Sequence, residues 1–155
     1  MKRFQLLLSI ALMTLLGVAC ENGDNNDLPN NPEENRCYVG TMVVDQNDGT
    51  TFTKEDVEVD YEIKDGKVNF VMYKVKFAQG MPITLDMVVE GVDFEEANGT
   101  YTLSGDGIVP YAMGGPFEKY TITKLTGAID DNTFTLDFMC GEYPVTYSGT
   151  KSETK

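Results

Sequence analysis

The sequence predicts an all-β domain, either a barrel or a sandwich, built from short antiparallel strands. Three observations predict it. Apolar and polar residues alternate with a period of two through most of residues 37–151, turn-forming Asp, Asn and Gly residues separate the alternating runs, and no run has the 3.6-residue apolar period of a helix. Short strands at near-regular spacing with such turns are typical of barrels and sandwiches.

The first three strands are predicted over residues 38–45, 56–63 and 68–77. The second is the clearest, because apolar residues at its odd positions alternate with carboxylates at its even positions, and an Asp-Gly hairpin turn follows it. In the third, the apolar residues change parity near residues 72–73. Such a change predicts a β-bulge, which helps a sheet to curl.

Five further strands complete the domain, over residues 83–90, 100–103, 120–129, 134–138 and 143–150. The first and last strands carry similar strings, Tyr-Val-Gly-Thr from Tyr38 and Tyr-Ser-Gly-Thr from Tyr147. Glycine inside a strand often marks a close backbone approach. Unless the similarity is a coincidence of common β residues, these glycines predict that the first strand pairs with the last. Such pairing would also remove two exposed sheet edges.

Two motifs suggest a family. The first is Tyr-x-Gly-x-Met-x-Val at residues 38–44, and the second is Val-x-Tyr-x-Gly-x-Lys at residues 145–151. Together with the middle strands, these motifs resemble those of the calycin-like, or lipocalin-like, barrel lipoproteins of Gram-negative gut bacteria. The resemblance covers about residues 37–151. It implies a single antiparallel eight-stranded up-and-down barrel. That family has no settled activity, so the resemblance implies no catalytic residues.

The N-terminal region has the layout of a secretory signal over residues 1–19. A basic start precedes an apolar run that ends in small residues, and Cys20 follows directly. Small residues before a cysteine resemble the lipobox of bacterial lipoproteins, in which the signal is cut before the cysteine and that residue is acylated. Acyl chains on Cys20 would anchor the protein to a membrane outside the cytoplasm. The alternative is ordinary secretion without acylation.

Residues 20–36 are predicted to form a flexible acidic tether, because Leu28 alone cannot offset the entropy of ordering the segment. Acidic residues after a lipidated cysteine resemble a signal for transfer to the cell surface in those bacteria, although a plain solvated spacer explains them equally well. We therefore expect an outer-membrane lipoprotein that faces the periplasm or the outside. Residues 152–155 form a C-terminal tail.

The charge and composition exclude several classes of function. The chain has 12 basic and 25 acidic residues, and removal of residues 1–19 leaves 10 basic residues and a net charge of −15. Such a field repels nucleic acid, so no nucleic-acid partner is expected. The chain has no histidine, which is the usual general base and a common metal ligand.

No recognisable catalytic or metal-binding motif is present either. The acidic stretch that begins at Asp45 misses the spacing of a calcium loop, and Asp56 stands where that loop requires Glu. Nucleophile elbows, phosphate-binding loops and paired CxxC motifs are absent from the sequence. We therefore expect no metal, no cofactor, no catalytic residue and no enzymatic activity.

Cys37 and Cys140 are the cysteines that remain beside Cys20. Disulfides persist outside the cytoplasm, so these two are candidates for a bridge. A bridge that closes so long a loop would stabilise the fold by about 4–5 kcal/mol. The alternative is two buried thiols too far apart to meet.

Residues 105–119 are the most suggestive segment for binding. They are rich in Gly and Pro, which indicates a loop, yet they carry several large apolar side chains. One interpretation is that the loop folds over the barrel mouth as a lid, with Tyr111, Met113 and Phe117 touching a ligand. The alternatives are a plug that packs on the barrel end without a ligand, and an exposed patch for a protein partner.

These features leave three functions open. The expected one is a membrane-anchored binding module whose barrel holds a small apolar or amphipathic molecule, supported by a content of eight Phe, eight Tyr and eight Met residues. The second is a surface accessory protein that binds a glycan or a host protein and has no barrel ligand. The least expected is an enzyme that uses carboxylates. The sequence does not identify a protein partner.

Overall fold

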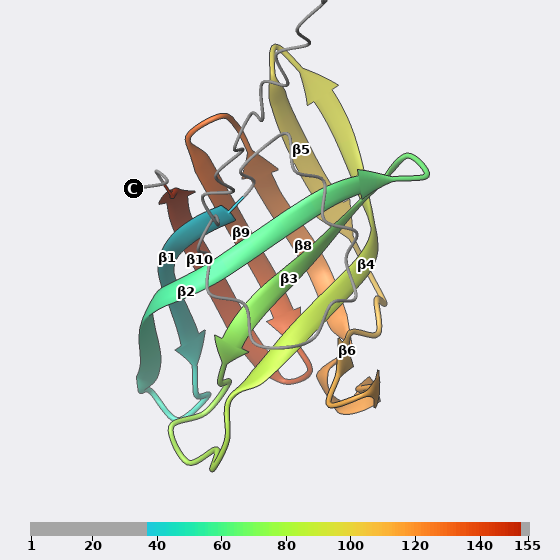
Figure 1. The fold of residues 1–155 in the computed structure, drawn as a ribbon. Coiled ribbons are helices and arrows are strands. Elements are labelled where there is room, and N and C mark those ends of the chain that lie inside the picture. Colours follow the sequence, from blue (N-terminus) through green and yellow to red (C-terminus); the bar gives the residue numbers. More distant parts are fainter. Residues whose placement is uncertain (1–36, 153–155) are drawn as a thin grey trace, which may run out of the picture.

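The computed structural model describes residues 37–152, which are built almost entirely of β-strands (Figure 1). The strands are β1 (Cys37–Asp45), β2 (Thr51–Lys64), β3 (Lys67–Val75), β4 (Leu85–Ala97), β5 (Thr100–Gly105), β6 (Tyr111–Ala112), β7 (Gly115–Pro116), β8 (Ile122–Ile129), β9 (Thr133–Cys140) and β10 (Tyr143–Lys151). One short 3-10 helix, η1 (Glu118–Tyr120), precedes β8. Within residues 37–152 no helix has the length and apolar character needed to cross a membrane.

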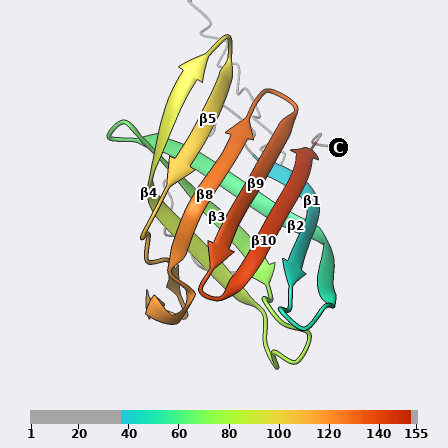
Figure 2. The same cartoon turned by 180° about the vertical axis from the view of Figure 1, so that it is seen from behind.

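Eight of the strands form a closed antiparallel barrel (Figures 1 and 2). Each of β1 to β5 and β8 to β10 pairs with its neighbour in the chain, and β1 also pairs with β10. The small β6–β7 hairpin and η1 lie in the connection between β5 and β8. The predicted eight-stranded up-and-down barrel is confirmed.

The barrel closes where β1 pairs with β10, and glycines lie at this closure. Gly40 is opposite Gly149 in the register. A Cβ atom on Gly40 would collide with the Ser148 carbonyl oxygen, and one on Gly149 would collide with the Tyr147 hydroxyl. The β1 and β10 backbones therefore approach closely because Gly40 has no side chain, which is the role that the sequence predicts for a glycine here, whereas Gly149 makes room for the Tyr147 side chain.

β3 contains the predicted bulge. Its register with β4 shifts between Met72 and Val75, and Lys74 has a φ of 51°. Met72 and Val75 both lie in the core, while Tyr73 is half-buried and Lys74 is exposed. The bulge therefore directs two consecutive side chains, Tyr73 and Lys74, to the outer wall of the barrel.

β4 is longer than the predicted strand over residues 83–90, because a second bulge hides its continuation. The pairing of β3 with β4 shifts between Val68 and Phe70, where Gly91 has a φ of 79°. The side-chain oxygen of the buried Asn69 accepts a 2.8 Å hydrogen bond from the Gly91 N–H. Apolar residues change parity at this bulge, so the alternation in the sequence stops at Glu90 although the strand continues.

The interior of the barrel is occupied by a continuous hydrophobic core. At one end, the Phe134 ring contacts four other aromatic rings with centroid distances between 5.6 and 6.1 Å, those of Tyr38, Tyr61, Phe70 and Tyr147. At the opposite end of β9, Tyr120 of η1 stacks on Phe77 with centroids 5.3 Å apart. The inward positions are thus filled by side chains at both ends of the barrel.

The suggested disulfide between Cys37 and Cys140 is not formed, because the Cys140 thiol is free and buried. Cys140 pairs with Tyr143 at the start of β10, whereas the carbonyl of Cys37 accepts a hydrogen bond from Ser152, just beyond the end of β10. A strand of this length separates its two ends by roughly 25 Å. A disulfide requires Cα atoms within about 7 Å of each other, so this bridge is geometrically impossible.

Candidate functional site

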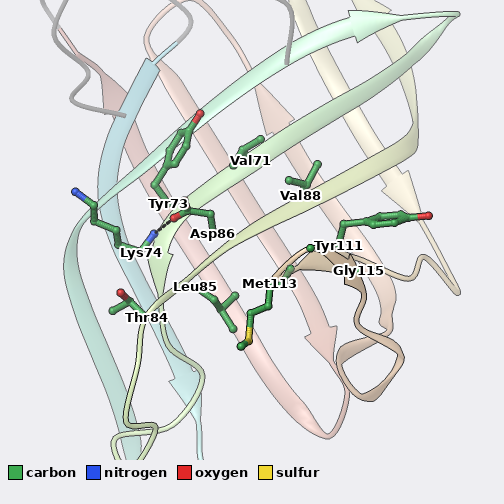
Figure 3. A pocket seen from close by; sticks show the side chains of 12 residues that line it. Val71, Tyr73, Lys74, Thr84, Leu85, Asp86, Val88, Tyr111, Met113 and Gly115 are labelled. Carbon is green, nitrogen blue, oxygen red and sulfur yellow. Dashed lines mark hydrogen bonds between the residues drawn. The ribbon is translucent and has the colours of Figure 1, made fainter. Parts of the chain in front are cut away.

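An open groove of about 580 Å³ lies on the outer wall of the barrel, between β3–β4 and the β6–β7 hairpin (Figure 3). Its lining comes from three parts of the chain that lie far apart in sequence. The lining residues are Val71, Tyr73, Lys74, Thr84, Leu85, Asp86, Val88, Tyr111, Ala112, Met113, Gly114 and Gly115.

The floor of the groove is apolar. Val71 of β3 pairs with Val88 of β4, and Val88 pairs with Tyr111 of β6. Directly paired residues on neighbouring strands share a face of the sheet. Their neighbours Met72 and Met87 belong to the core, so Val71 and Val88 face outward. An apolar strip therefore crosses the outside of the barrel at this level.

The β6–β7 hairpin forms one wall of the groove. Its buried Ala112 anchors it to the core, and the Phe117 N–H donates a 2.8 Å hydrogen bond to the Pro110 carbonyl across its base. Between these fixed points the hairpin presents Tyr111, which is 48% exposed, and Met113, which is 72% exposed. Large apolar side chains so exposed on a fixed hairpin mark a contact surface.

The β3 bulge forms the opposite wall. The Lys74 N–H donates a 2.8 Å hydrogen bond to the Asp86 carboxylate, which fixes the bulge to β4 (Figure 3). The Tyr73 hydroxyl donates a 3.2 Å hydrogen bond to Oδ2 of Asp60 on β2. The end of this wall is therefore the Tyr73 hydroxyl, which is hydrogen-bonded to the Asp60 carboxylate.

Burial changes the ionisation of that pair. It raises the pKa of the Asp60 carboxyl, an effect that the Tyr73 hydrogen bond opposes and the nearby Glu58 carboxylate reinforces. Burial, followed by the Asp60 charge, also raises the pKa of Tyr73, so its hydroxyl stays protonated at neutral pH. Among the described residues, the buried Oδ1 of Asp60 accepts no hydrogen bond.

The three residues proposed as a lid are divided between two places. Tyr111 and Met113 line the outer groove. Phe117 instead packs on the core at the barrel end, where its ring centroid lies 4.7 Å from that of Tyr120. A single lid over the barrel mouth is therefore not formed. Phe117 plugs the barrel end, whereas Tyr111 and Met113 form a wall of the groove, which opens on the side of the barrel.

Sequence reasoning missed the floor and the second wall of the groove. Val88 occupies a position in β4 where the alternation places polar residues, and Val71 lies outward between two core residues. An apolar residue at an outward position is a signal of this kind of surface, but it becomes specific only when the register aligns Val71, Val88 and Tyr111.

The rest of the described chain offers little reactive chemistry. No cluster of three acidic or cysteine side chains within residues 37–152 is arranged to hold a metal ion. Burial raises the pKa of the Cys140 thiol to about 12, so it is protonated at neutral pH and donates to the Tyr120 carbonyl at 3.7 Å. A protonated, buried thiol is a poor nucleophile.

The predicted lipidation site Cys20, the signal over residues 1–19 and the tether over residues 20–36 lie outside the described residues. No family model matches the chain, and no curated protein or solved structure matches it either. The resemblance to calycin-like lipoproteins therefore stays a prediction that rests on the quoted motifs.

Proposed function

We propose that this protein is a lipid-anchored binding module that takes a small apolar or amphipathic ligand in its outer groove. The observation that carries the proposal is that the exposed side chains of Tyr111 and Met113 line the same groove as the outward-facing Val71 and Val88. The volume of about 580 Å³ is within the range of small-molecule sites, roughly 300–1,000 Å³.

The packed interior supports a site on the outside of the barrel. An eight-stranded barrel has room either for side chains or for one small ligand. Here Met42, Met72, Met87 and Phe70 are fully buried members of one continuous core. A ligand inside would have to displace such side chains, whereas the outer groove is already open to solvent.

The proposed location of the module at a membrane rests on the N-terminal sequence. In the proposal, residues 1–19 are removed, Cys20 is acylated, and the tether presents the barrel from the outer membrane toward the periplasm or the outside. Membership among the calycin-like barrel lipoproteins is part of the same proposal. Metabolic labelling with a fatty acid tests it, because label is expected on the wild-type chain and none on the Cys20→Ser variant.

A second candidate is a surface accessory protein that binds a glycan or a host protein without a small ligand. It is favoured by the exposure of a third large apolar side chain, Ile83, which is 49% exposed and close in sequence to the groove residues Thr84 and Leu85. Protease treatment of intact cells tests this candidate. It requires the barrel to be cleaved from the cell surface, and a strictly periplasmic barrel would exclude host contact.

Calorimetric titration with 1-decanol tests the groove directly. The chain from residue 20 onward, with Cys20→Ser, is suitable because the barrel closes within residues 37–151. We expect Met113→Ser to weaken decanol binding about 5- to 10-fold, since part of a methionine burial of about 1.5–3 kcal/mol is lost. The matched control is Met139→Ser on the outer side of β9, which should leave the affinity unchanged. Equal weakening by both variants, or no binding to the wild type, would contradict the proposal.

A further inference from the structure

The apolar floor of the groove belongs to a longer row of residues that runs across four strands. Asp60 of β2 pairs with Val71, Val71 with Val88, and Val88 with Tyr111 of β6. Neighbouring strands lie about 4.8 Å apart, so the row is roughly 14 Å long. A carboxylate stands at one end, an aromatic ring stands at the other, and two valines lie between them.

The Asp60 carboxylate at the end of this row lacks one of its hydrogen bonds. Its Oδ2 accepts a hydrogen bond from Tyr73, which lines the groove, but its buried Oδ1 has no hydrogen-bond partner among the described residues. A buried acceptor without a donor is costly, and more so when it carries charge. A ligand that brings a charged N–H donor to this end would supply both the missing hydrogen bond and the opposite charge.

The surrounding charges favour the same kind of ligand. Glu58 and Glu62 are on the same face of β2 as Asp60, and Asp86 of β4 lies beside the β3 bulge, on the same side of the groove as Tyr73 (Figure 3). Lys74 is the lysine of the lining, and its side chain points away from the valine floor (Figure 3). The net charge of −15 that remains without residues 1–19 adds a long-range field of the same sign. The polar end of the groove is therefore acidic.

We infer that the groove selects an amphiphile that carries a protonated amine. The inference rests on the proposed function and adds the chemical class of the ligand. The ammonium group binds at Asp60 and the Tyr73 hydroxyl, with the Tyr73 ring available for a cation–π contact. The apolar chain lies over Val71 and Val88, and its far end meets the side chains of the β6–β7 hairpin.

Three probes of equal chain length test the inference: decylammonium, 1-decanol and decanoate, titrated at pH 7 against the same Cys20→Ser chain. We expect decylammonium to bind at least 10-fold more tightly than decanol, and decanoate to bind more weakly than decanol. Asp60→Asn should weaken decylammonium about 10-fold and decanol by a much smaller factor, because only the ammonium loses an opposite charge. Tyr73→Phe should weaken decylammonium by a smaller factor.

The matched control is Asp137→Asn, which removes an exposed carboxylate from the outer side of β9 and should change none of the affinities. Equal affinity for decylammonium and decanol, both weakened by Met113→Ser, would overturn the inference and leave the proposed function intact. No binding of any probe would overturn both. If Asp60→Asn fails to fold, the wild-type preference for the amine over the alcohol decides the question alone.

Discussion

Gly40 of β1 lies directly opposite Gly149 of β10, at the pairing that closes the barrel. Neither position has room for a Cβ atom, because the Ser148 carbonyl and the Tyr147 hydroxyl occupy the space that the Cβ atoms would take. The same hydroxyl lies 3.2 Å from the carbonyl oxygens of Tyr38 and Val57 and shares its one proton between them. Closure thus depends on two missing side chains and on one tyrosine that links β10, β1 and β2.

Gly40→Ala should destabilise the barrel by about 1–3 kcal/mol, because the added methyl forces the β1 and β10 backbones apart. Urea unfolding followed by circular dichroism measures the loss. Gly80→Ala is the matched control, since a Cβ atom at Gly80 meets nothing within 4 Å and should change the free energy of unfolding by less than about 0.5 kcal/mol. Equal effects of the two variants would contradict the importance of the close approach at the closure.

Tyr147→Phe should cost on the order of 1–2 kcal/mol of unfolding free energy, because the buried hydrogen bond that the hydroxyl shares between two carbonyls is lost while the ring stays in the core. The same unfolding experiment measures it. Tyr101→Phe, on a half-buried tyrosine of β5, is the control and should have little effect. A neutral Tyr147→Phe variant would show that the hydroxyl does not stabilise the closure.

Cys140 should be unreactive in the folded protein and reactive once the chain unfolds. Its thiol is buried and its pKa is raised to about 12, so almost no thiolate forms near pH 8. Iodoacetamide labelling without reductant, followed by peptide mass spectrometry, compares native protein with protein in urea. Residue 140 that stays unlabelled in urea and becomes labelled only after reduction would mean that it is bridged after all.

Asp60→Asn should make the protein more stable at pH 7. Burial raises the pKa of Asp60 in the folded state above its ordinary value of 3.8, so folding favours the protonated acid. Stability is therefore lost as the pH rises from the ordinary pKa through the folded one, and asparagine avoids that loss. We expect a gain in the free energy of unfolding at pH 7 that shrinks as the pH falls toward the ordinary pKa of the carboxyl.

Urea midpoints of the wild type and Asp60→Asn between pH 3 and pH 8 check this sign. Glu58 and Tyr73 face Asp60 and are present in both chains, so the difference between the two curves isolates the Asp60 carboxyl. Asp137→Asn serves as the control for loss of one exposed charge. A difference that is constant with pH, or a less stable asparagine variant at pH 7, would refute a raised pKa at Asp60.

Substitutions of Phe117 and Met113 should have different effects, the first on the free energy of unfolding and the second on ligand affinity. Phe117→Ala removes a ring that packs on Tyr120 and on the core, so we expect a loss of about 1–2 kcal/mol of unfolding free energy and unchanged decanol affinity. Met113→Ala should change stability by less than about 0.5 kcal/mol, because the side chain is 72% exposed, and should weaken decanol binding. The reverse assignment would mean that the hairpin is a plug only.

Most of the barrel could be predicted from the sequence, because strand alternation is a local signal. The carboxylates at the even positions of residues 56–63 fix which face of β2 is buried, and the glycines at positions 40 and 149 indicate the closure. The bulge of β3 was also visible, since its core residues change parity. The bulge at Gly91 interrupts the alternation, so the second half of β4 does not follow from this local signal.

The groove could not be predicted to the same extent, because it depends on contacts between distant segments. Only the pairing of Val88 with Tyr111 places the β6–β7 hairpin beside the valine floor. The direction of Tyr73 depends on the backbone conformation of Lys74, which the sequence does not specify. Phe117 could not be distinguished from Tyr111 by composition, although the first packs on the core and the second faces solvent.

Methyl NMR of a chain labelled at valine and methionine, titrated with 1-decanol, tests most directly that the ligand site is on the outer wall of the barrel. The groove predicts shifts at the methyl groups of Val71, Val88 and Met113, with Met42 and Val59 in the interior unchanged. Shifts at Met42 and Val59 with Met113 unchanged would place the ligand inside the barrel and contradict the outer groove.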